Sequence, residues 1–191
     1  MARSPGSATQ QQVELICHAA APSAAVRRIL VVVDCIGGEL RLRYELEGAT
    51  DAVLLPPPHV AKFADNLWRH TCFEAFVKEV GSNAYCELNF SPSTEWAAYW
   101  FTDYRQSMTP IDIPTLPSIS IERSAERLSI DAVVQLSALR ELHYGGQLQL
   151  ALSAVIEDND QRISYWALVH PTEKPDFHHA ASFALTLSAL R

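Results

Sequence analysis

The chain has 191 residues, of which 48% are hydrophobic, and its formal net charge is −7. This length suits one domain around a single core, and the acidic charge argues against a nucleic-acid partner, because phosphate binding needs a basic face. No apolar run is long enough to cross a bilayer or to serve as a signal peptide, so we expect a cytoplasmic protein without a membrane partner.

Strand patterns dominate the amino-terminal part of the chain. Residues 1–12 are mostly small and polar, which predicts a disordered tail followed by one ligand-binding domain over 13–191. The clearest strand pair covers 27–36, which is almost continuously apolar or β-branched, and 39–47, which alternates strictly. The two glycines between them fit a two-residue hairpin turn. Further strands are expected at 13–18 and 51–55.

The middle of the chain adds strands and one long loop. Three consecutive prolines forbid ladder hydrogen bonds, so 56–67 is expected to be a loop. Residues 73–80 and 84–90 fit an antiparallel pair around a Gly-Ser-Asn turn. Residues 96–104 fit either a strand or a helix by spacing, and their aromatic content favours a strand.

The carboxyl-terminal part continues this rhythm after a proline-rich crossing loop at 107–117. About ten short strands with Gly, Pro and Asn turns predict an all-β fold, a jelly-roll-like antiparallel β-sandwich with little helix. The remaining strands are expected at 119–121, 128–134, 147–156, 163–168 and 182–187, with one or two helical turns at 136–142.

Polar residues stand beside tryptophan at two strand ends. Trp68 precedes Arg69 and His70 at a loop-to-strand junction, and Trp96 follows a Ser-Pro-Ser break. Small-ligand sites combine apolar walls with a few placed polar groups, and a sugar ring can stack on an indole. The alternative is that these tryptophans belong to the core, because a buried aromatic side chain stabilises a fold by itself.

A histidine-rich segment covers 170–179. Two imidazoles and a carboxylate could ligate zinc or iron, but the spacing matches no established metal motif, and the cysteines form no CxxC pair. We therefore expect no metal and no cofactor. A hydrogen-bonded structural loop and a ligand-contacting rim remain as alternatives, and adjacent side chains of an extended segment point in opposite directions. The candidate contacts are His170, Lys174, Asp176, His178 and His179.

Two carboxyl groups, Glu74 and Glu87, lie inside apolar strand patterns. A pair of carboxylates on adjacent strands could hydrolyse a glycoside. A buried carboxylate, however, needs a partner, and this favours structural ion pairs. Candidate partners are Arg69, His70, Lys78 and Arg105.

Three stretches carry a family resemblance: 67–76, 87–93 with the following Trp96, and 170–179. Together they resemble DOMON-like domains, which are related to family-9 carbohydrate-binding modules, over about 27–187. The resemblance implies a jelly-roll-like sandwich that binds a ligand without chemistry, and relatives bind sugars or haem. Calcium-binding acidic loops of the sugar-binding relatives have no clear counterpart, since 158–160 fit a plain turn. Haem-binding relatives use a Met and a His, and here Met108 lies in a loop.

The sequence therefore predicts a non-catalytic module for a small polar ligand, with a carbohydrate favoured. The alternatives are a metal-dependent or carboxylate-based enzyme acting on sugars, and a haem-binding electron-transfer module. The predicted ligand contacts are Trp68, Arg69, His70, Trp96, His170, Lys174, Asp176, His178 and His179, with Glu74 and Glu87 as a structural pair or part of the site.

Overall fold

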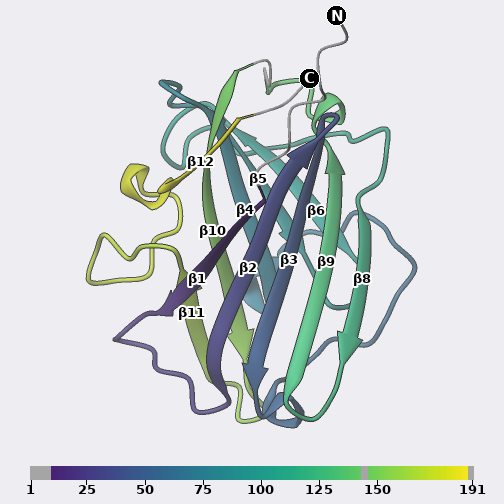
Figure 1. Cartoon of the computed structure of the whole chain (residues 1–191), viewed down its shortest axis with the longest axis vertical. Coiled ribbons are helices and arrows are strands. Elements are labelled where there is room, and N and C mark those ends of the chain that lie inside the picture. The colour runs from purple at the N-terminus through teal and green to yellow at the C-terminus, as the bar shows by residue number, and fades with distance from the viewer. Residues whose placement is uncertain (1–9, 143–145, 189–191) are drawn as a thin grey trace, which may run out of the picture.

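The computed structural model describes residues 10–142 and 146–188, which fold into two packed layers of antiparallel strands (Figure 1). Sheet A contains, in spatial order, β1 (Gln11–Cys17), β2 (Val26–Ile36), β3 (Glu39–Gly48), β9 (Arg127–Gln135) and β8 (Ser118–Arg123). Sheet B contains β7 (Thr109–Pro110), β6 (Trp96–Phe101), β5 (Tyr85–Phe90), β4 (Cys72–Glu79), β10 (Gln147–Glu157) and β11 (Ile163–Ala167), with β12 (Leu185–Ser188) beside β10. The predicted all-β antiparallel sandwich is confirmed.

β1 joins the two sheets because it pairs with both. Residues 11–15 pair with β2, whereas Ile16 and Cys17 pair with β11 at the edge of sheet B. The expected tail over 1–12 is therefore too long, since Gln11 and Gln12 already belong to a strand. The rest of that tail, 1–9, lies outside the described residues.

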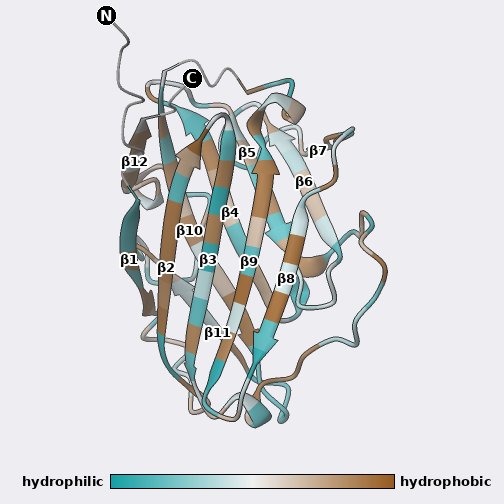
Figure 2. Ribbon diagram, turned by 45° about the vertical axis from the view of Figure 1, so that its right-hand side comes forward, coloured by the Kyte–Doolittle hydropathy of each residue, from teal (hydrophilic) through white to brown (hydrophobic). Residues whose placement is uncertain are grey.

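The hairpin between β2 and β3 follows directly from its turn sequence. Gly37 and Gly38 have φ values of +58° and +79°, which non-glycine residues rarely adopt and which a two-residue hairpin turn of this type requires. Ile36 pairs with Glu39 across the turn, and Leu40, Leu42 and Tyr44 all point into the core. Hydrophilic and apolar residues consequently alternate along β3, whereas β2 is mostly apolar (Figure 2).

The expected strand at 51–55 is wrong. Thr50–Ala52 form the 3-10 turn η1, and Val53 makes only an isolated bridge to Asp158. Local hydrogen bonds from Ala52 to Ala49 and from Val53 to Thr50 take the donors that a ladder would need. The other 3-10 turns are η2 (Leu67–Arg69), η3 (Leu136–Ala138) and η4 (Ala180–Ser182).

The outer face of sheet A is exposed to solvent, whereas both faces of sheet B are covered by other parts of the protein. Inward residues of both sheets, such as Tyr44 and Phe73, form the main core. Because alternate strand residues point to opposite faces, Phe76 and Tyr99 lie on the outer face of sheet B. There they form a second apolar cluster with Phe183, which lies between η4 and β12, so the strand expected at 182–187 begins only at Leu185. Among the described residues, no helix has the length and apolar character needed to cross a membrane.

Candidate functional site

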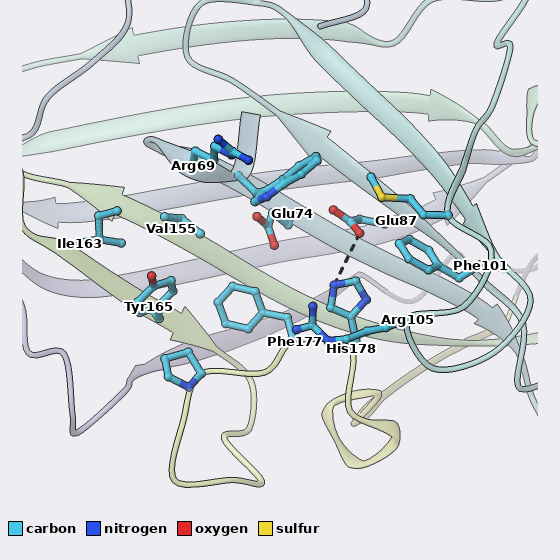
Figure 3. Close-up of a pocket in the computed structure, with 13 residues that line it drawn as sticks. Arg69, Glu74, Glu87, Phe101, Arg105, Val155, Ile163, Tyr165, Phe177 and His178 are labelled. Carbon is cyan, nitrogen blue, oxygen red and sulfur yellow. Dashed lines mark ion pairs between the residues drawn. The ribbon is translucent and has the colours of Figure 1, made fainter. Parts of the chain in front are cut away.

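A cavity of about 510 Å³ lies over the outer face of sheet B, and we call it the sheet-B pocket (Figure 3). Its apolar wall includes Trp68, Phe101, Tyr165 and Phe177. Its polar lining consists of Arg69, Glu74, Glu87, Arg105 and His178. Residues far apart in the sequence therefore meet here, because loops before β4, after β6 and after β11 all cover the same sheet face.

The loop before β4 places Trp68 over the sheet. Asn66 adopts a left-handed conformation with φ of +63°, and η2 follows it directly. The indole of Trp68 then packs edge-on against Tyr99, with ring centroids 5.6 Å apart. The hydroxyl of Tyr99 donates to Asp65 at 2.6 Å. Tyr99 of β6 therefore fixes this loop through a hydrogen bond to Asp65 and a ring contact with Trp68.

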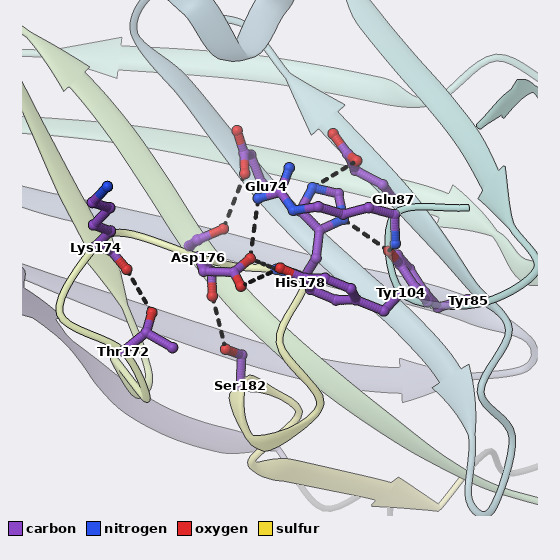
Figure 4. A network of polar contacts seen from close by, with 11 residues as sticks. Glu74, Tyr85, Glu87, Tyr104, Thr172, Lys174, Asp176, His178 and Ser182 are labelled. Carbon is purple, nitrogen blue, oxygen red and sulfur yellow. Dashed lines mark hydrogen bonds and ion pairs between the residues drawn. The ribbon is translucent and has the colours of Figure 1, made fainter. Parts of the chain in front are cut away.

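The two other loops are tied together at the rim of the pocket (Figure 4). The Arg105 guanidinium donates to one oxygen of Asp176 at 3.0 Å, and the Tyr104 hydroxyl donates to the other at 2.8 Å. Partial burial alone would raise the pKa of Asp176, but the hydrogen bonds from Tyr104 and Arg105 outweigh it and lower the pKa. Asp176 is thus a carboxylate that positions Arg105 rather than part of the pocket lining.

Glu74 and Glu87 lie on the floor of the pocket. They are 2% and 4% exposed and occupy diagonal positions on β4 and β5, where Glu74 faces Asn89 and Glu87 faces Phe76. Ser153 donates to one Glu74 oxygen at 3.1 Å, and Asn89 donates to one Glu87 oxygen at 2.8 Å. The other Glu74 oxygen, Oε1, is buried with no hydrogen-bond partner among the described residues.

Burial raises the pKa values of both carboxyl groups. Loss of solvation raises the pKa of Glu74 well above its ordinary value, and the nearby Glu87 raises it further. Burial also raises the pKa of Glu87 to about 7, although the Asn89 hydrogen bond and the charge of Arg105 act in the opposite direction. The floor of the pocket therefore holds protons near neutral pH.

His178 is an uncharged neighbour of these acids. Burial, followed by the positive charge of Arg105, lowers the pKa of His178 to about 4. Its Nδ1 lies 2.8 Å from the Tyr85 hydroxyl oxygen, which already accepts the Arg105 backbone N–H. This arrangement favours donation from Tyr85 to Nδ1 and leaves the imidazole hydrogen on Nε2, which lies 3.8 Å from Glu87.

The structure brings together only some of the predicted contacts. Trp68, Arg69 and His178 line the sheet-B pocket. His70 does not line it, because its ring turns outward and pairs with Glu157 at 2.7 Å. Trp96 is 4% exposed and packs in the core between the sheets, against a different cavity.

The other loop residues also point elsewhere. His170 bonds the Ile16 carbonyl at 2.7 Å, and the Nδ1 of His179 accepts the Ala181 N–H at 3.1 Å and caps η4. Lys174 is exposed, and its carbonyl accepts the Thr172 hydroxyl. His178 and His179 thus contact different partners, but they lie in a turn and a bend rather than in the extended segment that was expected. Within the described residues, no group of three or more His, Cys, Asp or Glu is arranged to hold a metal ion.

Glu74 and Glu87 have different neighbours from those expected. Among the described residues, neither makes an ion pair with a lysine or arginine, and two of the candidate partners, His70 and Arg105, pair with Glu157 and Asp176 instead. Arg105 pairs with Asp176, and the Lys78 ammonium lies 4.5 Å from the Phe183 ring centroid. The two acids are thus pocket-lining groups rather than halves of structural Arg or Lys pairs.

The sequence did not point to Phe101, Tyr165 or Phe177 as lining residues. Phe101 belongs to a strand that is buried on both faces, where alternation does not reveal which face a loop will cover. Tyr165 lies on the half-buried face of β11. Phe177 could have been identified from the sequence, because it lies between Asp176 and His178 in the histidine-rich segment.

No protein-family model and no curated protein matches this sequence. Among solved structures, a proposed carbohydrate-binding protein from Bacteroides uniformis matches 94% of this chain and 86% of its own, with a TM-score of 0.71 and 16% identity. A family-9 carbohydrate-binding module from Caldicellulosiruptor kristjanssonii matches in two complexes at 13% identity. Its cellotriose complex has a TM-score of 0.50 and covers 93% of this chain and 79% of that one. Its glucose complex has a TM-score of 0.52, with coverages of 92% and 83%. The chain therefore shares its fold with carbohydrate-binding modules of family 9.

Proposed function

We propose that this chain is a non-catalytic module that binds a carbohydrate in the sheet-B pocket. The observation that carries the proposal is the combination, in one cavity, of an aromatic wall with buried hydrogen-bonding groups. Trp68 and Phe177 offer apolar surfaces to the C–H face of a sugar ring, while Glu74, Glu87 and Arg105 can bond its hydroxyls. The volume of about 510 Å³ falls in the range of roughly 300–1,000 Å³ that small-molecule sites occupy.

The fold similarity supports this proposal. Two of the similar structures hold cellotriose and glucose. Fold alone does not specify function, so the pocket of this chain is the main support for the proposal, and the two sugar complexes of a similar fold are consistent with it.

Replacing Trp68 with alanine is expected to weaken sugar binding about tenfold or more, because an aromatic contact of about 1.4 kcal/mol corresponds to a factor of ten. Isothermal titration of the wild type and the variant against a panel of mono- and disaccharides measures this. Leu116→Ala is the control, since it removes an exposed apolar side chain that lines a different cavity. Unchanged affinity in Trp68→Ala, or no binding to any sugar, would contradict the proposal.

Glycoside hydrolysis is a second candidate, because two carboxyl groups share the pocket and the pKa of Glu87 is about 7, as suits a general acid. Binding is favoured because Glu87 is 4% exposed and held by Asn89. Release of nitrophenol from nitrophenyl glycosides by the wild type, and not by Glu87→Gln, would favour the enzyme instead.

The haem alternative fits the pocket poorly. Met108 and His178 both line it, but both ring nitrogens of His178 are directed at protein groups, Tyr85 and Glu87. The imidazole is therefore not free to act as an axial ligand.

A further inference from the structure

We infer that the ligand of the sheet-B pocket carries a protonated amine, as an amino sugar does, and that Glu74 and Glu87 bind this amine. The inference deepens the proposed function and rests on it, because it assumes that the pocket takes a sugar. It adds a chemical class that a general sugar site would not require.

The first observation is an unused acceptor. Glu74 Oε1 is buried and has no hydrogen-bond partner among the described residues, although Glu74 lines the pocket. A buried polar group left without a partner costs about 1–3 kcal/mol, and more when it is charged. A ligand that donates a hydrogen bond to this oxygen would recover that free energy.

The second observation is the balance of charge around the floor. Arg105 is paired with Asp176 at 3.0 Å, Arg69 is exposed at the rim, and His178 is uncharged. Among the described residues, no Arg or Lys nitrogen lies within 4.0 Å of either floor carboxyl group. The floor can therefore accept one positive charge without displacing an existing ion pair.

The third observation is the aromatic wall. Figure 3 shows Glu74 and Glu87 side by side, with Phe177 and His178 across from them. Trp68 and Tyr165 also belong to the apolar lining. A cation over the face of an aromatic ring gains about 0.5–2 kcal/mol, with the larger values when it is desolvated. An amino sugar offers both a C–H face for stacking and an ammonium group for the carboxylates.

Binding of such a cation should release a proton from the pocket floor. Burial raises the pKa of Glu74 well above its usual value and that of Glu87 to about 7, so the empty floor holds protons. An ammonium group favours the carboxylate forms, and affinity then rises as pH rises from 5 to 7. Of the other facing groups, Arg69 and Arg105 stay positive and Asp176 stays negative. His178, with a pKa of about 4, stays neutral, and burial raises the pKa values of Tyr44, Cys72 and Tyr85, which also stay neutral.

The test is calorimetric titration with glucosamine, galactosamine and mannosamine, each beside its neutral parent sugar and its N-acetyl derivative. At pH 7 we expect at least one amino sugar to bind tenfold or more tightly than its parent and N-acetyl forms. Its heat should depend on the ionisation enthalpy of the buffer, which reports proton release. Both effects should disappear in Glu74→Gln and shrink in Glu87→Gln. Glu157→Gln is the matched control, because Glu157 is another buried glutamate of sheet B that does not line the pocket.

The outcomes separate the two proposals. Equal binding of amino and neutral sugars would overturn the amine inference and leave the carbohydrate proposal standing. Amine preference that persists in both Glu74→Gln and Glu87→Gln would overturn the assignment of these two groups. Absence of binding to every sugar would overturn both proposals. If one glutamine variant loses its native circular dichroism spectrum, it is unfolded, and the amine preference measured in the other variant then tests the assignment.

Discussion

Replacing Glu87 with glutamine is expected to raise the free energy of unfolding by about 3 kcal/mol at pH 8 and to leave it nearly unchanged at pH 4. The cause is burial, which raises the pKa of Glu87 from 4.5 to about 7 in the folded protein. Each pKa unit corresponds to about 1.36 kcal/mol. Glutamine keeps an oxygen for the Asn89 donor but never carries a charge.

The sign follows from the protons bound in each state. Below pH 4.5 Glu87 is protonated in both the folded and the unfolded chain, so it contributes no pH dependence. As pH rises from 4.5 to 7, the unfolded chain loses this proton first, and the folded protein becomes progressively less stable. Above pH 7 the full penalty remains, and the glutamine variant avoids it.

Urea denaturation at pH 4, 6 and 8 measures this difference. Glu126→Gln is the control, because this exposed turn residue should change stability by less than about 0.5 kcal/mol. A gain for Glu87→Gln that is the same at all three pH values would show that ionisation is not its source. A loss of stability at pH 8 would contradict the prediction outright.

Tyr44→Ala is expected to lower the free energy of unfolding by about 3–5 kcal/mol, as truncations of large buried aromatic side chains do. Tyr44 is 0% exposed, and its ring packs 5.2 Å from that of Phe73 in the core between the sheets. Its hydroxyl donates to the Glu74 carbonyl at 2.6 Å. This side chain thus links β3 of sheet A to the backbone of the residue that forms the pocket floor.

Tyr44→Phe separates the contribution of the packed ring from that of the hydroxyl hydrogen bond. It keeps the ring and removes the hydrogen bond, so it should cost only about 0.5–1.5 kcal/mol. Thermal and urea unfolding of both variants measure the costs. A cost below about 2 kcal/mol for the alanine variant, or equal costs for the two, would show that the ring does not hold the layers together as described.

The strands were predictable because their signals are local. Alternation between 39 and 47 and the glycine pair before it determine both the hairpin and its inward face. The segment 51–55 has strand-like composition, yet its backbone bonds locally and Arg123 donates to the Thr50 carbonyl at 2.8 Å. Such a contact depends on a residue more than seventy positions away, which a local pattern does not contain.

The site was only partly predictable for a related reason. Composition identified loops where polar and aromatic residues gather, and Trp68, Arg69 and His178 do line one cavity. It did not identify which way each side chain turns. His70 meets Glu157, 87 positions away, which no local pattern contains, whereas His179 caps a turn through the N–H of Ala181.

The pocket combines a floor on strands with walls on loops, and this division has an evolutionary consequence. Glu74 and Glu87 keep their spacing as long as β4 and β5 of sheet B pair. The part of the wall that lies outside the strands comes from η2, 102–108 and 170–183, and its lining residues lie outside the main core. Mutations in these segments can therefore change which ligand binds without disturbing the two sheets. Ligand specificity can thus diverge in evolution while the fold is retained.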